Sequence, residues 1–100
     1  MRLGIMVTTD RCLEQVLGLT RAARERGHDV AIFATDAGVI LLGDGRFASL
    51  SGMPAVAMSY CDQSAQARGG APAGLPATII RGSQFENAVM NAESDKVIVL

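Results

Sequence analysis

Short apolar runs alternate with helix-patterned segments along the whole chain, and this alternation limits the possible folds more than any other feature. Residues 3–7 form a continuous apolar run, and residues 8–10 after it are of the polar types that start helices. Apolar positions then recur at helical spacing through 12–26, and Gly27 stands where a left-handed cap would end that helix. The opening segment therefore predicts a buried strand, a turn and an amphipathic helix.

The same unit recurs through the rest of the chain. Ser83 and Glu86 have the spacing of a capping box, in which each side chain satisfies a free backbone N–H at the start of a helix. Together with turn formers and apolar runs, this pattern predicts strands at 30–34, 55–60 and 96–100, helices at 35–42, 62–68 and 83–93, a connector or single helical turn at 46–52, and a loop at 70–76 that continues into a brief extended piece at 78–80.

The apolar runs lack polar alternation, which is typical of strands that are covered on both faces of a parallel sheet. A chain of 100 residues has room for one hydrophobic core. We therefore predict a single α/β domain over residues 1–100, with a three-layer, flavodoxin-like, doubly wound parallel sheet of four to five strands. With right-handed crossovers, 2-1-3-4 is the most economical strand order.

Charge and composition exclude several classes of function. A net charge of −1 gives no broad basic field, so we expect neither nucleic acid nor an anionic membrane surface as a partner. No apolar run approaches the roughly 20 residues that span a bilayer, and we expect a cytoplasmic protein. Two cysteines and one histidine cannot form a structural zinc site, and no phosphate-binding glycine motif is present, so we expect no metal and no cofactor. The single histidine, His28, precedes the strand at 30–34, where a surface or turn role is expected.

The working site of an open parallel sheet lies beyond the carboxyl ends of its strands, near the point where the strand order reverses. In the predicted order, the strands at 3–7 and 55–60 flank that point. We expect their ends to bring Cys61 together with the pocket residues Thr8, Thr9, Asp10 and Asp62.

Cys61 lies where a strand gives way to a helix, and there unpaired backbone N–H groups favour a thiolate. Ser64 follows one helical turn later, so its hydroxyl can donate a hydrogen bond to the sulfur. The negative charge of Asp62 works against ionisation. From position alone, an inert cysteine at a strand end is an equal alternative.

The run AVAMSYCDQSA from Ala55 to Ala65, with Gly69 after it, resembles the cysteine-bearing segment of the DsrE/DsrF-like family, which includes sulfur-relay subunits related to TusD. Residues 3–9, 27–30 and 92–97 are also similar to that family, so the resemblance spans nearly the whole chain. It implies that Cys61 receives sulfane sulfur as a persulfide and passes it on, with donor and acceptor proteins as partners.

Cys12 opens the first helix on the predicted site edge, and adjacent strands lie about 4.8 Å apart. One hypothesis is that Cys12 resolves a persulfide on Cys61 or forms a reversible disulfide with it. The alternative is that Cys12 is a small helix residue packed beneath the sheet edge, and it is the favoured one because free cysteines are often simply buried.

The segment 37–42 is apolar on every side, and a helix of this kind needs cover all round. Self-association would supply it, and the resemblance implies trimers or hexamers.

The sequence thus favours a sulfur-carrier or sulfurtransferase subunit that uses Cys61, with Ser64 and Cys12 as further candidate catalytic residues. Two alternatives stay open. One is a thiol-disulfide oxidoreductase based on the Cys-x-x-Ser spacing, and the other is a non-catalytic oligomeric binding or scaffold protein of the same fold.

Overall fold

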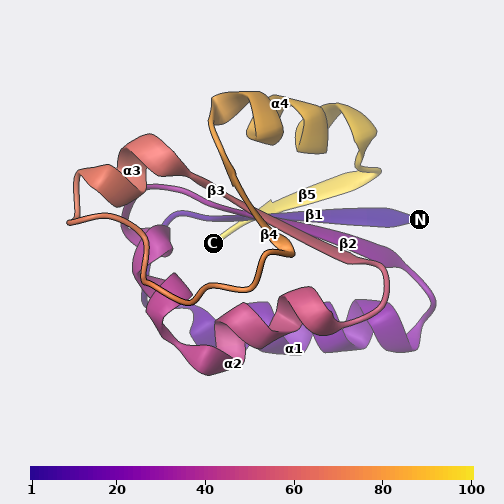
Figure 1. Cartoon of the computed structure of the whole chain (residues 1–100). Coiled ribbons are helices and arrows are strands. Elements are labelled where there is room, and N and C mark those ends of the chain that lie inside the picture. The colour runs from indigo at the N-terminus through magenta and orange to yellow at the C-terminus, as the bar shows by residue number, and fades with distance from the viewer.

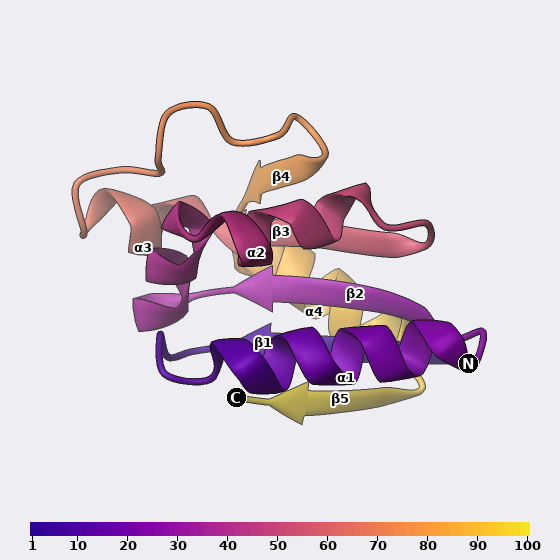
Figure 2. The same cartoon turned by 90° about the horizontal axis from the view of Figure 1, so that it is seen from below.

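The computed structural model describes residues 1–100, and its centre is a five-stranded sheet in the order β4-β3-β2-β1-β5 (Figure 2). Every neighbouring pair of strands is parallel. The prediction of an α/β domain with a parallel sheet is therefore confirmed. The extended piece expected at 78–80 overlaps strand β4, which brings the number of strands to five. The strands are β1 (Arg2–Val7), β2 (Asp29–Ala34), β3 (Val56–Cys61), β4 (Ile79–Gly82) and β5 (Lys96–Val99).

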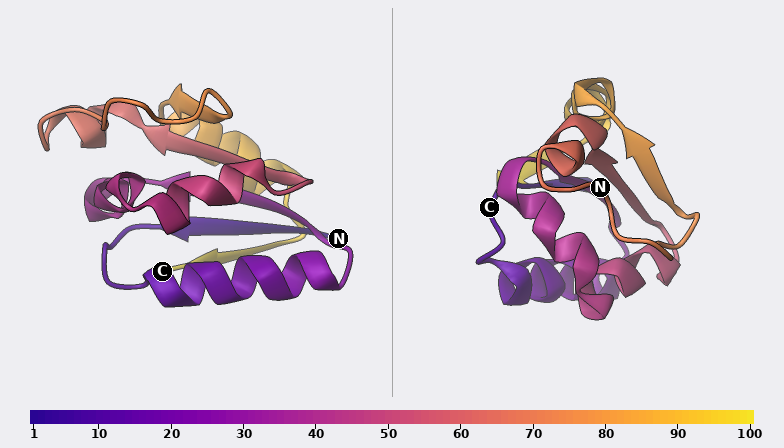
Figure 3. Two further views of the ribbon diagram at one scale, coloured as in Figure 1. Left: turned by 60° about the horizontal axis from the view of Figure 1, so that its bottom comes forward. Right: turned by 60° about the vertical axis from the view of Figure 1, so that its left-hand side comes forward.

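Helices cover both faces of the sheet, but unequally. The helical elements are α1 (Leu13–Glu25), the 3-10 helix η1 (Asp36–Gly43), α2 (Gly45–Ala48), the 3-10 helix η2 (Ser49–Gly52), α3 (Asp62–Gln66) and α4 (Gln84–Glu93). Figure 1 shows α1 and α2 below the sheet, α4 alone above it and α3 beyond one end of the strands. Figure 3 shows the same layers from two further directions.

The predicted strand order 2-1-3-4 is wrong, because β2 lies between β1 and β3. α1 and α2 lie on the same face of the sheet, so the two right-handed connections that contain them step in the same direction, from β1 to β2 to β3. Only α4 lies on the opposite face, and it carries the chain back across the sheet to β5 beside β1. The direction of each step depends on the face that each helix covers, which apolar runs do not specify.

The larger apolar core lies between the sheet and the α1/α2 layer. Alternate residues of β2 point to opposite faces, so Val30 and Ile32 belong to this cluster of 18 buried residues. Ala31 and Phe33 point to the α4 face, where they join Cys61 and Met90 in a cluster of four. The cysteine of interest therefore belongs to the smaller core.

The segment 37–42 is covered within the monomer, so the argument that it needs a second chain is wrong. It forms part of η1, and its residues Gly38, Val39, Leu41 and Leu42 are buried. Only Ile40 is exposed, at 51%. A Cβ atom at residue 38 would overlap the backbone carbonyl of Val7, so only glycine lets η1 pack this closely against the end of β1.

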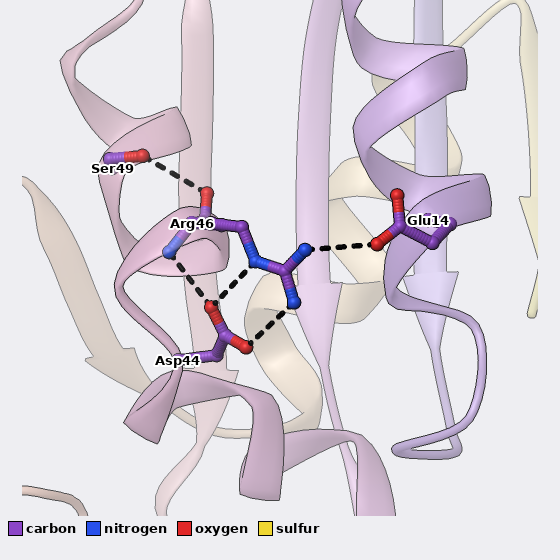
Figure 4. A network of polar contacts seen from close by, with 4 residues as sticks. All are labelled: Glu14, Asp44, Arg46 and Ser49. Carbon is purple, nitrogen blue, oxygen red and sulfur yellow. Dashed lines mark hydrogen bonds and ion pairs between the residues drawn. The ribbon is translucent and has the colours of Figure 1, made fainter.

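A surface network joins the connector to α1, as Figure 4 shows. The carboxylate of Asp44 accepts a hydrogen bond of 2.9 Å from the backbone N–H of Arg46 and so caps α2. The guanidinium of Arg46 pairs with Asp44 at 3.3 Å and with Glu14 of α1 at 3.0 Å. Exposed ion pairs of this kind contribute little to stability, so the network is a local link between α2 and α1 rather than a main source of stability.

Two local predictions are confirmed. Ser83 and Glu86 form the capping box of α4, with Ser83 N–H donating to Glu86 Oε2 at 2.6 Å and Phe85 N–H donating to Ser83 Oγ at 3.2 Å. Gly27 ends α1 with a positive φ of 78°. None of the helices has the length and apolar character needed to cross a bilayer.

Candidate functional site

The candidate site lies at the carboxyl edge of the sheet, where β2, β3 and β4 end side by side. The register pairs Ala34 with Tyr60 and Cys61 with Gly82. Thr35 is the next residue after Ala34, so it stands level with Cys61. Cys61 is therefore the central member of a row, with the end of β2 on one side and the end of β4 on the other.

The Cys61 side chain has an apolar side and a polar side. It packs in the cluster with Ala31, Phe33 and Met90 on the α4 face, and only 4% of the residue is exposed. Its polar neighbours are Ser64, in the first turn of α3, and the side chain that opens α4, Gln84.

These polar neighbours set the acidity of the thiol. Burial alone would raise the pKa of Cys61, because a thiolate is poorly solvated in an apolar cluster. Hydrogen bonds from the hydroxyl and backbone N–H of Ser64, the side chain of Gln84 and the backbone N–H of Gln63 outweigh this effect and hold the pKa below its ordinary value. The N–H groups are free to bind sulfur because the first turn of a helix gives them no partner.

A chain of hydrogen bonds leads from α4 to the sulfur. The amide Nε2 of Gln84 donates to Thr35 Oγ1 at 3.2 Å, and Thr35 Oγ1 lies 3.3 Å from Ser64 Oγ. Ser64 Oγ also accepts from the backbone N–H of Asp36 at 3.0 Å. A hydroxyl has one hydrogen, and that of Ser64 is used by Cys61, so we assign Thr35 as the donor to Ser64. With this assignment, Gln84 donates to Thr35, Thr35 donates to Ser64 and Ser64 donates to the sulfur of Cys61.

Asp36 contributes to this chain through its backbone. Its φ of 50° lies in the left-handed region, which few residues other than glycine adopt but which aspartate tolerates. This conformation accompanies the hydrogen bond from the Asp36 N–H to Ser64. An uncommon backbone angle is thus found within the polar half of the site.

Asp62 is the acidic residue expected to oppose the thiolate. Its carboxylate pairs with Arg81 of β4 at a distance of 2.9 Å. The guanidinium offsets the negative charge next to Cys61, so the opposition expected from the sequence is reduced.

The structure does not bring the other predicted pocket residues to Cys61. Thr8, Thr9 and Asp10 follow β1, and β2 separates that strand from β3. Thr8 instead bonds toward β5, with its backbone N–H and Oγ1 donating to the carbonyl of Leu100 at 2.6 and 2.9 Å.

Cys12 and Cys61 are not neighbours either. That hypothesis assumed that β1 and β3 are adjacent strands, and β2 lies between them. β1 and β3 are two strand spacings apart, roughly 10 Å. Cys12 precedes α1, which covers one face of the sheet, whereas Cys61 packs in the cluster on the other. Both cysteines are free.

Sequence reasoning missed Thr35 and Gln84. Each follows the end of a strand directly or by one residue, so the correct strand order would have placed both beside Cys61. His28 precedes β2, at the edge of the sheet opposite Cys61, as expected from the sequence, and its Nδ1 lies 3.2 Å from the amino group of Met1.

A groove of about 220 Å³ lies on the α4 face, between α4 and the strands β2, β3 and β4. Ala57 and Ser59 of β3, Ile80 of β4, and Phe85 and Val89 of α4 form part of its mostly apolar lining. Phe85 is 70% exposed, so this part of the face is uncovered in the monomer.

Comparison with known proteins shows the fold alone. The chain is similar to the YchN protein of E. coli, with a TM-score of 0.80 and 20% identity over the whole of both chains. It is also similar to MTH1491 of Methanobacterium thermoautotrophicum, a protein of unknown function, with a TM-score of 0.71 and 21% identity over 99% of this chain and 98% of that one. No protein-family model matches the chain, and no curated protein matches it. The chain therefore shares the fold of these two proteins, an α/β fold with a five-stranded parallel sheet flanked by helices.

Proposed function

We propose that the chain is a cytoplasmic sulfur-carrier or sulfurtransferase subunit that bears a persulfide on Cys61. The observation that carries this proposal is the set of hydrogen-bond donors around the sulfur. Ser64, Gln63 and Gln84 lower the pKa of a thiol that burial alone would make less acidic. A purely structural cysteine in an apolar cluster has no need of such donors.

The chemistry follows from the thiolate. The sulfur of Cys61 attacks the outer sulfur of a donor persulfide, R–S–SH. A sulfur–sulfur bond forms on Cys61 as that of the donor breaks, and the donor leaves as the thiolate R–S⁻ with the electron pair of the broken bond. Attack by an acceptor thiolate on the outer sulfur of the Cys61 persulfide then returns Cys61 to its thiolate. We propose proteins as the donor and the acceptor.

Ser64 acts in both steps as a donor to the charged sulfur. Its hydroxyl hydrogen is held toward Cys61 because Asp36 N–H and Thr35 occupy its acceptor positions. Cys61 is a thiolate both when it attacks and when it leaves, so a fixed donor stabilises the start and the end of the transfer.

Sulfur loading tests the proposal directly. A Cys12→Ser variant, which keeps Cys61 as its one thiol, is incubated with inorganic polysulfide, and its intact mass is measured before and after reduction. We expect a gain of one sulfur atom that a thiol reductant removes. The Cys61→Ser variant, which retains Cys12, is the matched control. Equal loading of the two variants, or none of either, contradicts the proposal.

A second candidate function is a non-catalytic scaffold that works as a homo-oligomer, a trimer or a hexamer. The groove on the α4 face, with the exposed Phe85 in its lining, favours this reading, because an exposed apolar side chain of one copy can pack against the apolar recess of another. Light scattering on the Phe85→Asp variant tests it. A wild-type oligomer that dissociates in the variant supports assembly through this face, and a wild-type monomer excludes it.

A further inference from the structure

One side chain crosses the row of strand ends above Cys61. Gln84 follows β4, whereas its hydrogen-bond acceptor, Thr35, follows β2. β3 lies between these strands, so the 3.2 Å bond from Gln84 Nε2 to Thr35 Oγ1 passes over the end of β3. The other end of the amide is also held, since Asn87 Nδ2 donates to Gln84 Oε1 at 3.2 Å. We call this side chain, with its bond to Thr35, the Gln84 strap.

The strap lies on the solvent side of the thiol. Gln84 itself is exposed, whereas Thr35 and Cys61 are 3% and 4% exposed. The apolar side of the sulfur is closed by buried residues, including Phe33 and Met90. A reagent therefore cannot come from the core, and the polar side beneath Gln84 is the open direction.

We propose that the Gln84 strap closes the thiol site, and that it must release Thr35 before a sulfur donor or acceptor can reach Cys61. The inference rests on the proposed function in naming sulfur transfer as the reaction that the strap controls. The closed state protects the thiolate and presents the Gln84 amide to it. The open state admits an attacking or attacked sulfur.

Release of the strap requires little rearrangement. The Gln84 amide gives up its contacts with Thr35, Asn87 and Cys61, and the Gln84 side chain rotates into water. The capping box keeps the start of α4 in place, because Ser83 and Glu86 bond through their own side chains and backbone rather than through the Gln84 amide. The site can therefore open without unfolding the helix.

Alkylation kinetics separate access from acidity. In the Cys12→Ser background, the rate of Cys61 alkylation by iodoacetamide is measured as a function of pH. The midpoint reports the pKa of the thiol, and the plateau at high pH, corrected for the greater nucleophilicity of a more basic thiolate, reports how often the site is open. Loss of the bond to Thr35 alone should raise the open population about two- to tenfold, so Gln84→Ala, which removes the whole strap, should raise the plateau by at least that factor. It should also move the midpoint to higher pH, because it removes a donor to the thiolate.

Thr35→Val is the second variant, since it preserves the shape of a buried side chain and removes the acceptor of the strap. Its plateau should rise as well. Gln15→Ala, which changes an exposed glutamine in α1 on the other layer, is the matched control and should leave both quantities unchanged. Thermal unfolding verifies that each variant is folded at the assay temperature.

If the plateau is unchanged in both Gln84→Ala and Thr35→Val, the proposal that the strap closes the site is contradicted, even if Cys61 still takes up sulfur from polysulfide. A raised plateau in a protein that takes up no sulfur supports the strap and contradicts the proposed function. A plateau that rises equally in Gln15→Ala also overturns the strap, because the effect is then a general loosening of the protein.

Discussion

The two faces of the sheet differ in the cover they receive and in the chemistry they hold. α1, α2 and the 3-10 helices cover one face, and most of the buried apolar residues lie there. α4 alone covers the other, which has a cluster of four buried residues and a groove of about 220 Å³. Cys61 belongs to this thinner side.

The difference indicates where a reactive thiol can be accommodated. A sulfur in the larger core would have hydrocarbon on every side, and its pKa would rise. At the carboxyl end of β3 on the α4 face, one side of Cys61 meets polar donors from α3 and α4 instead. The thicker layer therefore supplies most of the stability, and the thinner layer supplies the site.

The largest expected effect compares two phenylalanines from the two faces. Phe47→Ala removes a fully buried side chain from the α1/α2 layer and should lower the free energy of unfolding by about 3–5 kcal/mol. Phe85→Ala changes a residue that is 70% exposed and should alter it by less than about 0.5 kcal/mol. Urea unfolding measures both, and similar losses would break the contrast between the faces.

A smaller effect concerns the caps of two helices. Ser83→Ala removes the capping box of α4 and should lower the free energy of unfolding by about 1 kcal/mol, with faster alkylation of Cys61 as the first turn of α4 frays. Asp44→Ala removes the cap of α2 on the other face and is the control. Alkylation should respond only to the first change, and an equal response to both would contradict the assignment of α4 as the cover of the thiol.

The smallest effect concerns the charge beside the thiol. Arg81→Ala leaves the carboxylate of Asp62 without its partner, so the pKa of Cys61 should rise. The shift should be less than about one pH unit, since an exposed charge in water contributes about 1 kcal/mol or less. Asp62→Asn should move the alkylation midpoint the other way, and shifts in the same direction would show that the ion pair acts by a different route.

Much of the fold could be predicted from the sequence, because its signals are local. Apolar runs, the positive φ of Gly27 and the capping box at Ser83 each specify a segment without reference to distant parts of the chain. The strand order could not be predicted in this way. It depends on the face against which each helix packs, and those contacts join residues far apart in the sequence.

The candidate site shows the same division. The position of Cys61 at a strand end and the spacing to Ser64 are local, and the structure places the two side by side. Thr35 and Gln84 were missed because they come from the ends of β2 and β4, which flank β3 only in the observed order. The wrong order also led to the expectation that Thr8 and Cys12 lie near Cys61.

The central claim is that polar donors at the end of β3 keep Cys61 acidic in spite of its burial. The pH dependence of Cys61 alkylation in the Cys12→Ser protein, with and without Ser64→Ala, tests it most directly. A lowered pKa means that the rate is half-maximal below the ordinary value for a free cysteine, and loss of the Ser64 hydroxyl should move that midpoint upward. A midpoint at or above the free-cysteine value that does not respond to Ser64→Ala would contradict the account.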